Sequence, residues 1–314
     1  MYRVKEGIIG CAVGDALGYS SKGQEREELL NKPVLKMLPS IKNGIPKGSW
    51  SDSTSLTLAT MSSICKKNID YNDIAECCVS WITSNKYCSV NESFGIGKTT
   101  LKSLINYTKR KQPASKCGSV EFEENGNSSL KMILPLAYYF TALKVSKKDM
   151  YEVIKNVCSI THRQEISVCA CYIYFNYLLF IINSNNKFTA LKKLKTLDYS
   201  MFTNKTLDFF SRIIIGNIEE LDIDEIRSSS FVVDTLEASL WCFIKGDNYK
   251  SCVIGGANIG GDTSAIAAIT GTLASLYYGI DSIPKTWISD LRKYDYLVEI
   301  SENYEKFLRF LSYK

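Results

Sequence analysis

The sequence predicts an all-α protein, a single compact helical bundle that covers residues 1–314. Apolar residues recur at helical spacing nearly throughout the chain, and alternating strand patterns bounded by turn dipeptides are scarce. Several helix starts are marked by Ser, Thr or Asp. No low-complexity linker or internal repeat divides the chain, and one domain can still have this length.

Apolar residues that lie three and four positions apart predict three helices. The first long helix is expected to begin at residues 51–54, the second after Ser146, and the third includes residues 233–243. The apolar positions that define them are Leu56, Ala59, Met150, Val153, Ile154, Val157, Val233, Leu236, Leu240 and Phe243.

Residues 166–182 carry no charge and resemble a membrane span. The stretch is shorter than the roughly 20 residues that a span needs, and it contains Ser167 and Asn176. A buried central helix is therefore the better interpretation, and no membrane association is expected.

Residues 266–278 form the last predicted core helix, which is rich in Ala, Gly, Ser and Thr. Small residues allow close backbone approach, so this helix is expected at the centre of the bundle. Its positive N-terminal end would point at whatever lies beside Asp262.

The composition excludes several kinds of partner. The net charge of +5 comes from scattered lysines, without a dense basic block, so nucleic acid is not an expected ligand. The chain has 11 Cys but only one His and no Cys-x-x-Cys, which leaves a zinc site few ligands. Free thiols in a reducing cytoplasm fit best, with Cys169 and Cys242 as small core residues.

Two short motifs each place an aspartate beside hydroxyl residues, just ahead of a helical run. Residues 50–54 read Trp-Ser-Asp-Ser-Thr, and residues 260–264 read Gly-Gly-Asp-Thr-Ser. If folding brings them together, carboxylates and hydroxyls of this kind form an oxygen-ligand site for a hard cation. In the alternative interpretation, Asp52 and Asp262 serve only as helix N-caps.

Six blocks follow one another in order over the whole chain, to about Leu308: residues 7–18, 48–58, 125–130, 161–162, 233–238 and 260–263. One block alone would be a weak signal, but their order over the full length is specific. Together they resemble the ADP-ribosylglycohydrolases, the family that includes the enzyme reactivating ADP-ribosylated dinitrogenase reductase.

The resemblance implies an all-α fold with two Mg²⁺ ions in a central cleft. Those ions bind the ribose of an ADP-ribosyl group and position or activate the water that cleaves its glycosidic bond. The metal-binding positions that match in this chain are Ser51, Asp52 and Asp262.

The resemblance also implies where a nucleotide is held. Its phosphates would face the loop of Gly126, Asn127, Ser128 and Ser129, which by composition alone is a turn that can wrap an anion with backbone amides. His162 would border the distal ribose. Residues 126–132 read Gly-Asn-Ser-Ser-Leu-Lys-Met where the family pattern reads Gly-Asn-Gly-Ser-Leu-Met-Arg.

The acidic positions of the family pattern are lost systematically. The second Asp of the early motif is Ser53, and the Asp that should follow Thr263 is Ser264. The Phe-Asp-Ile-Gly segment reads Phe-Gly-Ile-Gly at residues 94–97. The acid expected after the first block aligns at Lys22, although a small shift would place Glu25 there.

These losses weaken the expected metal site. Two divalent cations repel each other unless several carboxylates neutralise them, and Asp52 with Asp262 supplies two negative charges against four positive ones. If Lys22 reaches the cleft, its ammonium group forms an ion pair there and occupies the space of a metal. Mg²⁺ binding is therefore expected to be weakened or absent.

The leading hypothesis is a protein that binds ADP-ribose, an NAD-derived nucleotide or an ADP-ribosylated protein with little or no two-metal hydrolysis. One alternative is an active hydrolase with one metal or none, in which Asp52, Asp262 and Glu25 orient the water. Another is a protein-interaction module, whose cleft is plugged by Lys22, Lys131 and bulky side chains.

Overall fold

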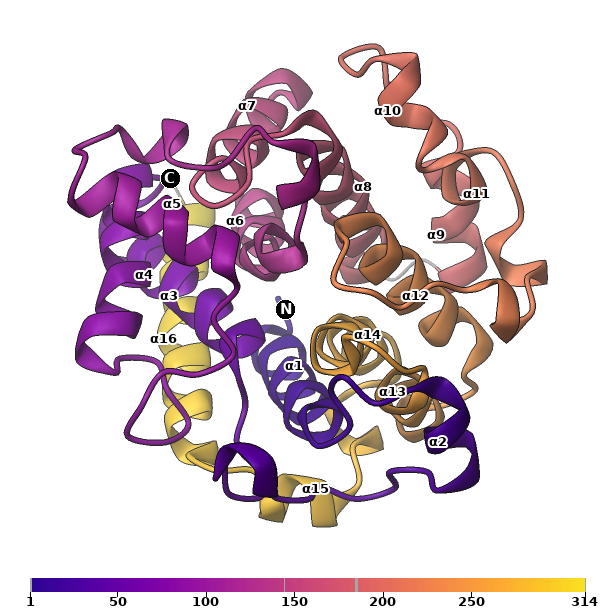
Figure 1. Ribbon diagram of the computed structural model, residues 1–314. Coiled ribbons are helices and arrows are strands. Elements are labelled where there is room, and N and C mark those ends of the chain that lie inside the picture. The colour runs from indigo at the N-terminus through magenta and orange to yellow at the C-terminus, as the bar shows by residue number, and fades with distance from the viewer. Residues whose placement is uncertain (1, 144, 184–185, 314) are drawn as a thin grey trace.

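Helices α1 (Val4–Tyr19) and α14 (Thr263–Tyr278) lie side by side at the centre of the molecule in the computed structural model (Figure 1). The structure describes residues 2–143, 145–183 and 186–313. The central position of the small-residue helix is confirmed, and α14 is buried from Thr263 to Leu276.

The described residues form sixteen α-helices and short 3-10 turns, without a strand, so the predicted all-α class is confirmed. The other helices surround the central pair (Figure 1): α2 (Arg26–Asn31), α3 (Asp52–Lys67), α4 (Tyr71–Ser84), α5 (Lys98–Thr108), α6 (Leu134–Ala142), α7 (Lys147–Cys158), α8 (Glu165–Ile182), α9 (Lys187–Leu194), α10 (Asn204–Asp208), α11 (Ser211–Ile214), α12 (Val232–Lys245), α13 (Tyr249–Asn258), α15 (Lys285–Asp290) and α16 (Tyr294–Ser312).

Helix α1 corrects one prediction, because the first long helix is α1 rather than the helix that begins at residues 51–54. Every residue of α1 from Gly7 to Gly18 is buried. A helix that is covered on all sides has no polar face, so it lacks the amphipathic spacing by which the other helices were predicted.

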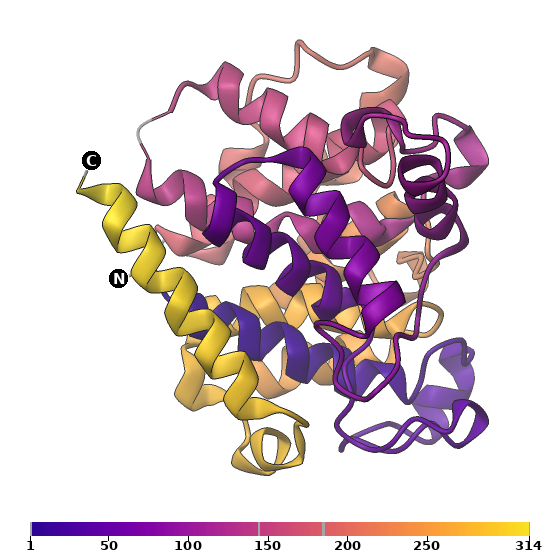
Figure 2. The same cartoon turned by 90° about the vertical axis from the view of Figure 1, so that its left-hand side faces the viewer.

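The predicted start of the second helix, after Ser146, is confirmed. Helix α7 begins after Ser146, whose hydroxyl accepts a hydrogen bond from the Asp149 backbone N–H at 3.1 Å. Residues 112–127 form irregular structure with short 3-10 turns. Helix α16 packs against α1 and α3 on the outside of the bundle (Figure 2).

Helix α8 confirms the predicted buried helix. In the described part of the chain it is the one helix long and apolar enough to cross a membrane by length and composition, and 78% of it is buried inside the protein. Cys169 on α8 and Cys242 on α12 are free thiols in the core.

The close contact of α1 and α14 depends on Gly14. A Cβ atom at this position would lie 2.0 Å from the Ala267 carbonyl oxygen, a backbone atom that cannot rotate away. We expect Gly14→Ala to lower the free energy of unfolding by about 2 kcal/mol, because overpacking outweighs the higher helix propensity of alanine. Urea denaturation measures this change.

Gly255 offers a matched control on α13. A Cβ atom there would meet Cys242 Sγ at 3.7 Å, an ordinary contact distance. Gly255→Ala should therefore stabilise the protein by about 0.5–1 kcal/mol. Equal effects of the two substitutions would contradict the close approach of α1 and α14.

Candidate ligand-binding cleft

A cleft of about 1110 Å³ opens where several helices begin. Its wall includes the first residues of α3 and α5 and the residues that precede α12 and α14, namely Asp52, Lys98, Phe231 and Asp262. Helix N-termini carry partial positive charge and free backbone N–H groups. The cleft is therefore suited to a ligand with anionic groups.

Asp15 on α1 supports the start of α3 from outside that helix. Its Oδ2 atom accepts hydrogen bonds from the backbone N–H groups of Ser51 at 2.9 Å and Thr54 at 3.0 Å. Its Oδ1 atom accepts from the hydroxyls of Ser51 and Ser264. Asp15 thus caps α3, and burial raises the pKa of its carboxyl group.

Asp52 and Asp262 do not cap their helices, so the N-cap alternative is wrong. In the described part of the chain, neither carboxylate accepts a hydrogen bond from the backbone of the helix it precedes or begins. Both side chains line the cleft instead. No local sequence pattern indicates that Asp15 caps α3 in their place.

The first ion pair of the cleft joins Lys131 to Asp52. Lys131 Nζ lies 2.5 Å from Asp52 Oδ2, and the two side chains are only 3% and 2% exposed. Lys131 comes from the 3-10 helix η4 (Asn127–Met132), which packs against α3. A buried charge pair of this kind removes the Asp52 carboxylate from the set of free anionic ligands.

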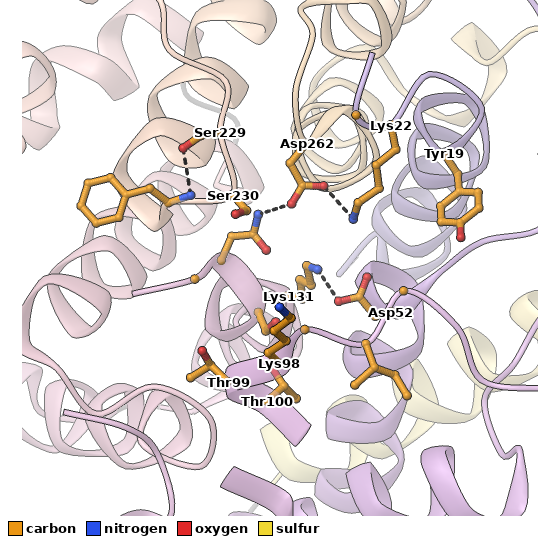
Figure 3. A pocket seen from close by; sticks show the side chains of 18 of the residues that line it. Tyr19, Lys22, Asp52, Lys98, Thr99, Thr100, Lys131, Ser229, Ser230 and Asp262 are labelled. Atoms are coloured by element: carbon orange, nitrogen blue, oxygen red, sulfur yellow. Dashed lines mark hydrogen bonds and ion pairs between the residues drawn. The ribbon is translucent and has the colours of Figure 1, made fainter. Parts of the chain in front are cut away.

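The second ion pair joins Lys22 to Asp262 at 2.8 Å. Lys22 therefore reaches the cleft, as the sequence hypothesis required. Asn127 also donates a hydrogen bond to Asp262 Oδ2 at 2.8 Å. Burial opposes the charge of both partners, but their mutual attraction outweighs it, so the pKa of Lys22 is raised and the pKa of Asp262 is lowered. Figure 3 shows the two ion pairs facing each other across the cleft.

These residues do not fit a pair of divalent cations. Asp52 and Asp262 are each neutralised by an ammonium group, and both oxygens of Asp15 already accept hydrogen bonds. In residues 2–143, 145–183 and 186–313, no group of three or more His, Cys, Asp or Glu side chains is placed to hold a metal ion. Two Mg²⁺ ions would need several free carboxylates.

The start of α5 forms a further part of the cleft wall. Lys98, Thr99 and Thr100 line the cleft in the first turn of this 11-residue helix (Figure 3). Gly97 precedes the helix and has no side chain that could cap it. The Thr100 hydroxyl is buried and has no hydrogen-bond partner among the described residues. This part of the wall thus offers donors to an anion.

An aromatic cluster lies beside the cleft at the start of α12. Phe231 lines the cleft, and its ring centroid lies 6.1 Å from that of Phe209 and 6.4 Å from that of Phe122. A β-bridge between Gly126 and Phe231 connects this cluster to the Asn125–Ser129 loop. The partly exposed ring of Phe231 can stack on a nucleobase.

His162 is buried in the cleft wall, only 1% exposed. Its Nδ1 atom lies 3.0 Å from the Thr161 hydroxyl, and a Cβ atom at Gly126 would lie 3.1 Å from its Nε2 atom. Burial, and then the charge of Lys131, lowers the pKa of His162 to about 3. The imidazole is therefore neutral at physiological pH.

This lowered pKa predicts a loss of stability in mild acid. Above pH 6.5 the imidazole is neutral in the folded and unfolded states; below it, only the unfolded chain takes up the proton. We expect His162 to cost about 2 kcal/mol of unfolding free energy between pH 7 and pH 5, at about 1.4 kcal/mol per pH unit. Urea denaturation of the wild type and His162→Gln at both values measures it.

The difference between the two proteins isolates this effect, because the chain has one His. Asp262 does not interfere, since its lowered pKa reduces stability only below pH 3.8. A wild type and a variant that lose the same stability between pH 7 and pH 5 would contradict the neutral, buried state of His162.

The structure brings together most of the predicted binding residues. Those that line the cleft are Lys22, Asp52, Gly126, Asn127, Ser128, His162 and Asp262. Others are buried in the wall behind it, namely Ser51, Ser53, Ser129, Thr263 and Ser264. Glu25, the alternative acid, is exposed and is not part of the cleft lining.

Other residues also line the cleft although the sequence analysis does not predict them, among them Tyr19, Lys98, Thr99, Thr100 and Phe231. A signal was present for some of them. Lys98 directly follows the segment at residues 94–97 that lacks its acid, and Phe231 lies just ahead of the block at residues 233–238. Their place in the cleft depends on tertiary contacts between distant segments.

The fold and the site together define a class of protein, an all-α bundle with a polar cleft where several of its helices begin. A solved structure described as an ADP-ribosylglycohydrolase-related protein complex has this fold: the TM-score is 0.80 at 22% sequence identity, with 98% of each chain covered. At this level of identity the likeness shows the fold alone.

The sequence profile of the ADP-ribosylglycohydrolases matches residues 1–310, and the chain belongs to this family. It is 28% identical over 304 residues to the ADP-ribosylarginine hydrolase Tri1 of Serratia proteamaculans, covering 96% of this chain and 78% of the relative. It is 25% identical over 287 residues to the ADP-ribosyl-[dinitrogen reductase] glycohydrolase of Rhodospirillum rubrum, covering 90% and 88% of the two chains.

Proposed function

We propose that this chain binds ADP-ribose, or an ADP-ribosyl group on a protein, and has little or no two-metal hydrolase activity. The observation that carries the proposal is the pairing of each cleft carboxylate with an ammonium group, Asp52 with Lys131 and Asp262 with Lys22. Cations supplied by the chain itself thus pair with the two carboxylates that the family pattern assigns to the metal site.

Other parts of the cleft support a nucleotide ligand. The first turn of α5 presents the Lys98 ammonium, the Thr100 hydroxyl and helix N–H groups to a diphosphate. Phe231 offers an aromatic face to the base. These features do not depend on a metal, so nucleotide affinity can persist after the acidic residues are lost.

The alternatives fit the cleft less well. An active hydrolase with Glu25 as an additional acid lacks support, because Glu25 lies outside the cleft lining. The interaction module required a plugged cleft, whereas Lys131 is folded onto Asp52 beside an open volume of about 1110 Å³. The nucleotide-binding proposal accounts for both observations.

The experiment is an assay of ADP-ribose release from ADP-ribosylarginine in millimolar Mg²⁺, followed by chromatography over time. Release at the uncatalysed rate is the expected result, because neither cleft carboxylate is free to hold a cation. Mg²⁺-dependent turnover by the purified protein would contradict the proposal. A protein without metal that still releases ADP-ribose would favour the metal-independent hydrolase.

The role of Phe231 gives a separate prediction. Phe231→Ala is expected to weaken ADP-ribose binding by about tenfold, because base stacking on an aromatic ring contributes about 1–3 kcal/mol. Calorimetric titration measures the dissociation constant. Phe307→Ala is a control, since Phe307 lies on α16 and does not line the cleft. Equal affinities of the Phe231 variant and the wild type would exclude stacking at this position.

A further inference from the structure

Helix α5 and the loop that follows it form a positively charged surface, which we call the basic surface. Residues 98–119 contain six basic residues and no acidic one. All six side chains are exposed, and within the described part of the chain only Lys102 forms an ion pair, with Glu124 at 2.8 Å. The six are Lys98, Lys102, Lys109, Arg110, Lys111 and Lys116. Most of this positive charge is therefore available to a partner.

The outer side of α5 also carries aliphatic side chains. Leu101 is 42% exposed and Ile105 is 41% exposed. Positions 98, 101, 102, 105 and 109 lie three or four residues apart, which places them on one side of the helix. The opposite side of α5 is buried against the protein. The basic surface therefore combines charge with apolar contact area, as protein-binding surfaces do.

A nucleic acid fits the basic surface less well than a protein does. Glu124 pairs with Lys102, and Glu121 and Glu123 in the same segment are exposed. These carboxylates would repel a chain of phosphates. A phosphate backbone would also leave Leu101 and Ile105 without an apolar partner. An acidic protein surface with an exposed aliphatic side chain meets both requirements.

The same chain presents such a surface at residues 213–226, which we call the acidic surface. This segment contains five acidic residues and no basic one, and four of the five acids are exposed. Ile215 in the same segment is 75% exposed. Among the residues that the structure describes, none of the five carboxylates forms an ion pair. The five acids are Glu219, Glu220, Asp222, Asp224 and Glu225.

The basic and acidic surfaces cannot meet within one molecule. Figure 1 shows α5 on the left of the molecule and α11, which the acidic surface follows, on the right, with the central helices between them. A contact between the two surfaces therefore joins two copies of the chain and is heterologous. Each dimer would keep one free basic and one free acidic surface, so that association continues beyond a dimer or closes into a ring.

We infer that the basic surface binds the acidic surface of a second copy, so that the protein associates head to tail. Lysine and arginine side chains pair with carboxylates, and Leu101 and Ile105 pack near Ile215. Exposed ion pairs contribute little individually and are screened by salt, so the association is reversible and weakens as ionic strength rises. The inference is independent of the proposed function, since of these residues only Lys98 lines the cleft.

The test is sedimentation velocity of the wild type and two charge-reversal variants, at micromolar to submillimolar concentrations and at low and high salt. Arg110→Glu/Lys116→Glu reverses charge on the basic surface, and Glu220→Lys/Asp224→Lys reverses it on the acidic surface. All four side chains are exposed and lie outside the cleft lining, so both variants are expected to fold and to bind ADP-ribose as the wild type does.

Lys250→Glu/Lys285→Glu is the matched control for the variant of the basic surface. Both lysines are exposed and lie on α13 and α15, away from the two surfaces. The control changes the net charge of the protein by the same amount as Arg110→Glu/Lys116→Glu. A difference between these two variants therefore reports the position of the charges and not their sum.

We expect the wild type and the control to form species larger than a dimer as concentration rises at low salt, and to dissociate at high salt. Each charge-reversal variant alone should associate at least about tenfold more weakly, because like charges then face each other. An equimolar mixture of the two variants should recover association, since the unchanged surface of each complements the unchanged surface of the other.

Three results would overturn the inference. The first is a wild type that stays monomeric at low salt over the whole concentration range. The second is a closed dimer that does not grow, because a head-to-tail contact between opposite sides leaves both ends free. The third is a mixture of the two variants that associates as weakly as either variant alone.

Discussion

Lys131→Met is expected to lower the free energy of unfolding by about 3–5 kcal/mol, because it leaves Asp52 as an uncompensated charge in the interior. Both side chains are almost fully buried, so solvent does not screen the loss. Methionine is also the residue of the family pattern at this position, and its size fits the site without a large cavity. Urea denaturation at pH 7 measures the change.

Two controls separate charge from packing. Lys131→Met/Asp52→Asn should recover most of the lost stability, because both charges are removed together. Lys47→Met breaks an ion pair whose lysine is half-exposed, and it should cost less than about 1 kcal/mol. If Lys131→Met and the double variant were equally unstable, the loss would be a packing effect, and the buried ion pair would not explain it.

Restoring the acidic pattern is expected to create a Mg²⁺ site. The variant combines Lys22→Glu, Ser53→Asp, Lys131→Met and Ser264→Asp, which adds three carboxylates and removes both ammonium groups. Without metal it should be less stable than the wild type, since its carboxylates repel each other. Mg²⁺ at about 100 times its dissociation constant should stabilise it by about 2.7 kcal/mol.

The measurement is urea denaturation of the wild type and the fourfold variant in EDTA and in millimolar Mg²⁺. Only the variant is expected to gain stability with Mg²⁺. A variant that retains Lys22 and Lys131 but carries Ser53→Asp and Ser264→Asp tests whether added carboxylates suffice. A wild type that gains as much stability as the fourfold variant would show that its two ion pairs do not exclude the metal.

Much of the fold could be predicted from the sequence, and α1 shows where the prediction ends. Helices such as α7 have one apolar and one polar face, so the spacing of their residues predicts them. Helix α1 is buried on all sides and is rich in glycine. Its role depends on the close approach to α14, a tertiary contact that no local pattern contains.

The parts of the site that the sequence predicts are those in which a residue type departs from the family pattern. Lys22 could be placed near Asp262 because a lysine stands where an acid is expected. The cap that Asp15 provides for α3 could not be predicted, since it joins residues 36 and 39 positions apart. The same limit applies to Ser53, whose motif position predicts a ligand contact. Its side chain is buried behind the cleft, and its hydroxyl has no hydrogen-bond partner in the part of the chain that the structure describes.

Lys131 shows a further limit of sequence reasoning. The sequence suggested Lys131 only as a side chain that could plug the cleft. In the structure η4 turns it toward α3, so that its ammonium group neutralises Asp52. Lysine thus stands where the family pattern has methionine, and Ser53 stands where it has an acid. Both substitutions have the same electrostatic consequence, because the positive charge beside Asp52 comes from a lysine and not from a metal ion.

The most direct test of this account is a calorimetric titration of ADP-ribose into metal-free protein, repeated in millimolar Mg²⁺. We expect micromolar binding with the same dissociation constant in both conditions, because Lys22 and Lys131 already provide the positive charge. Binding that occurs only in the presence of Mg²⁺ would contradict it, since the cleft would then hold a metal despite its two ion pairs.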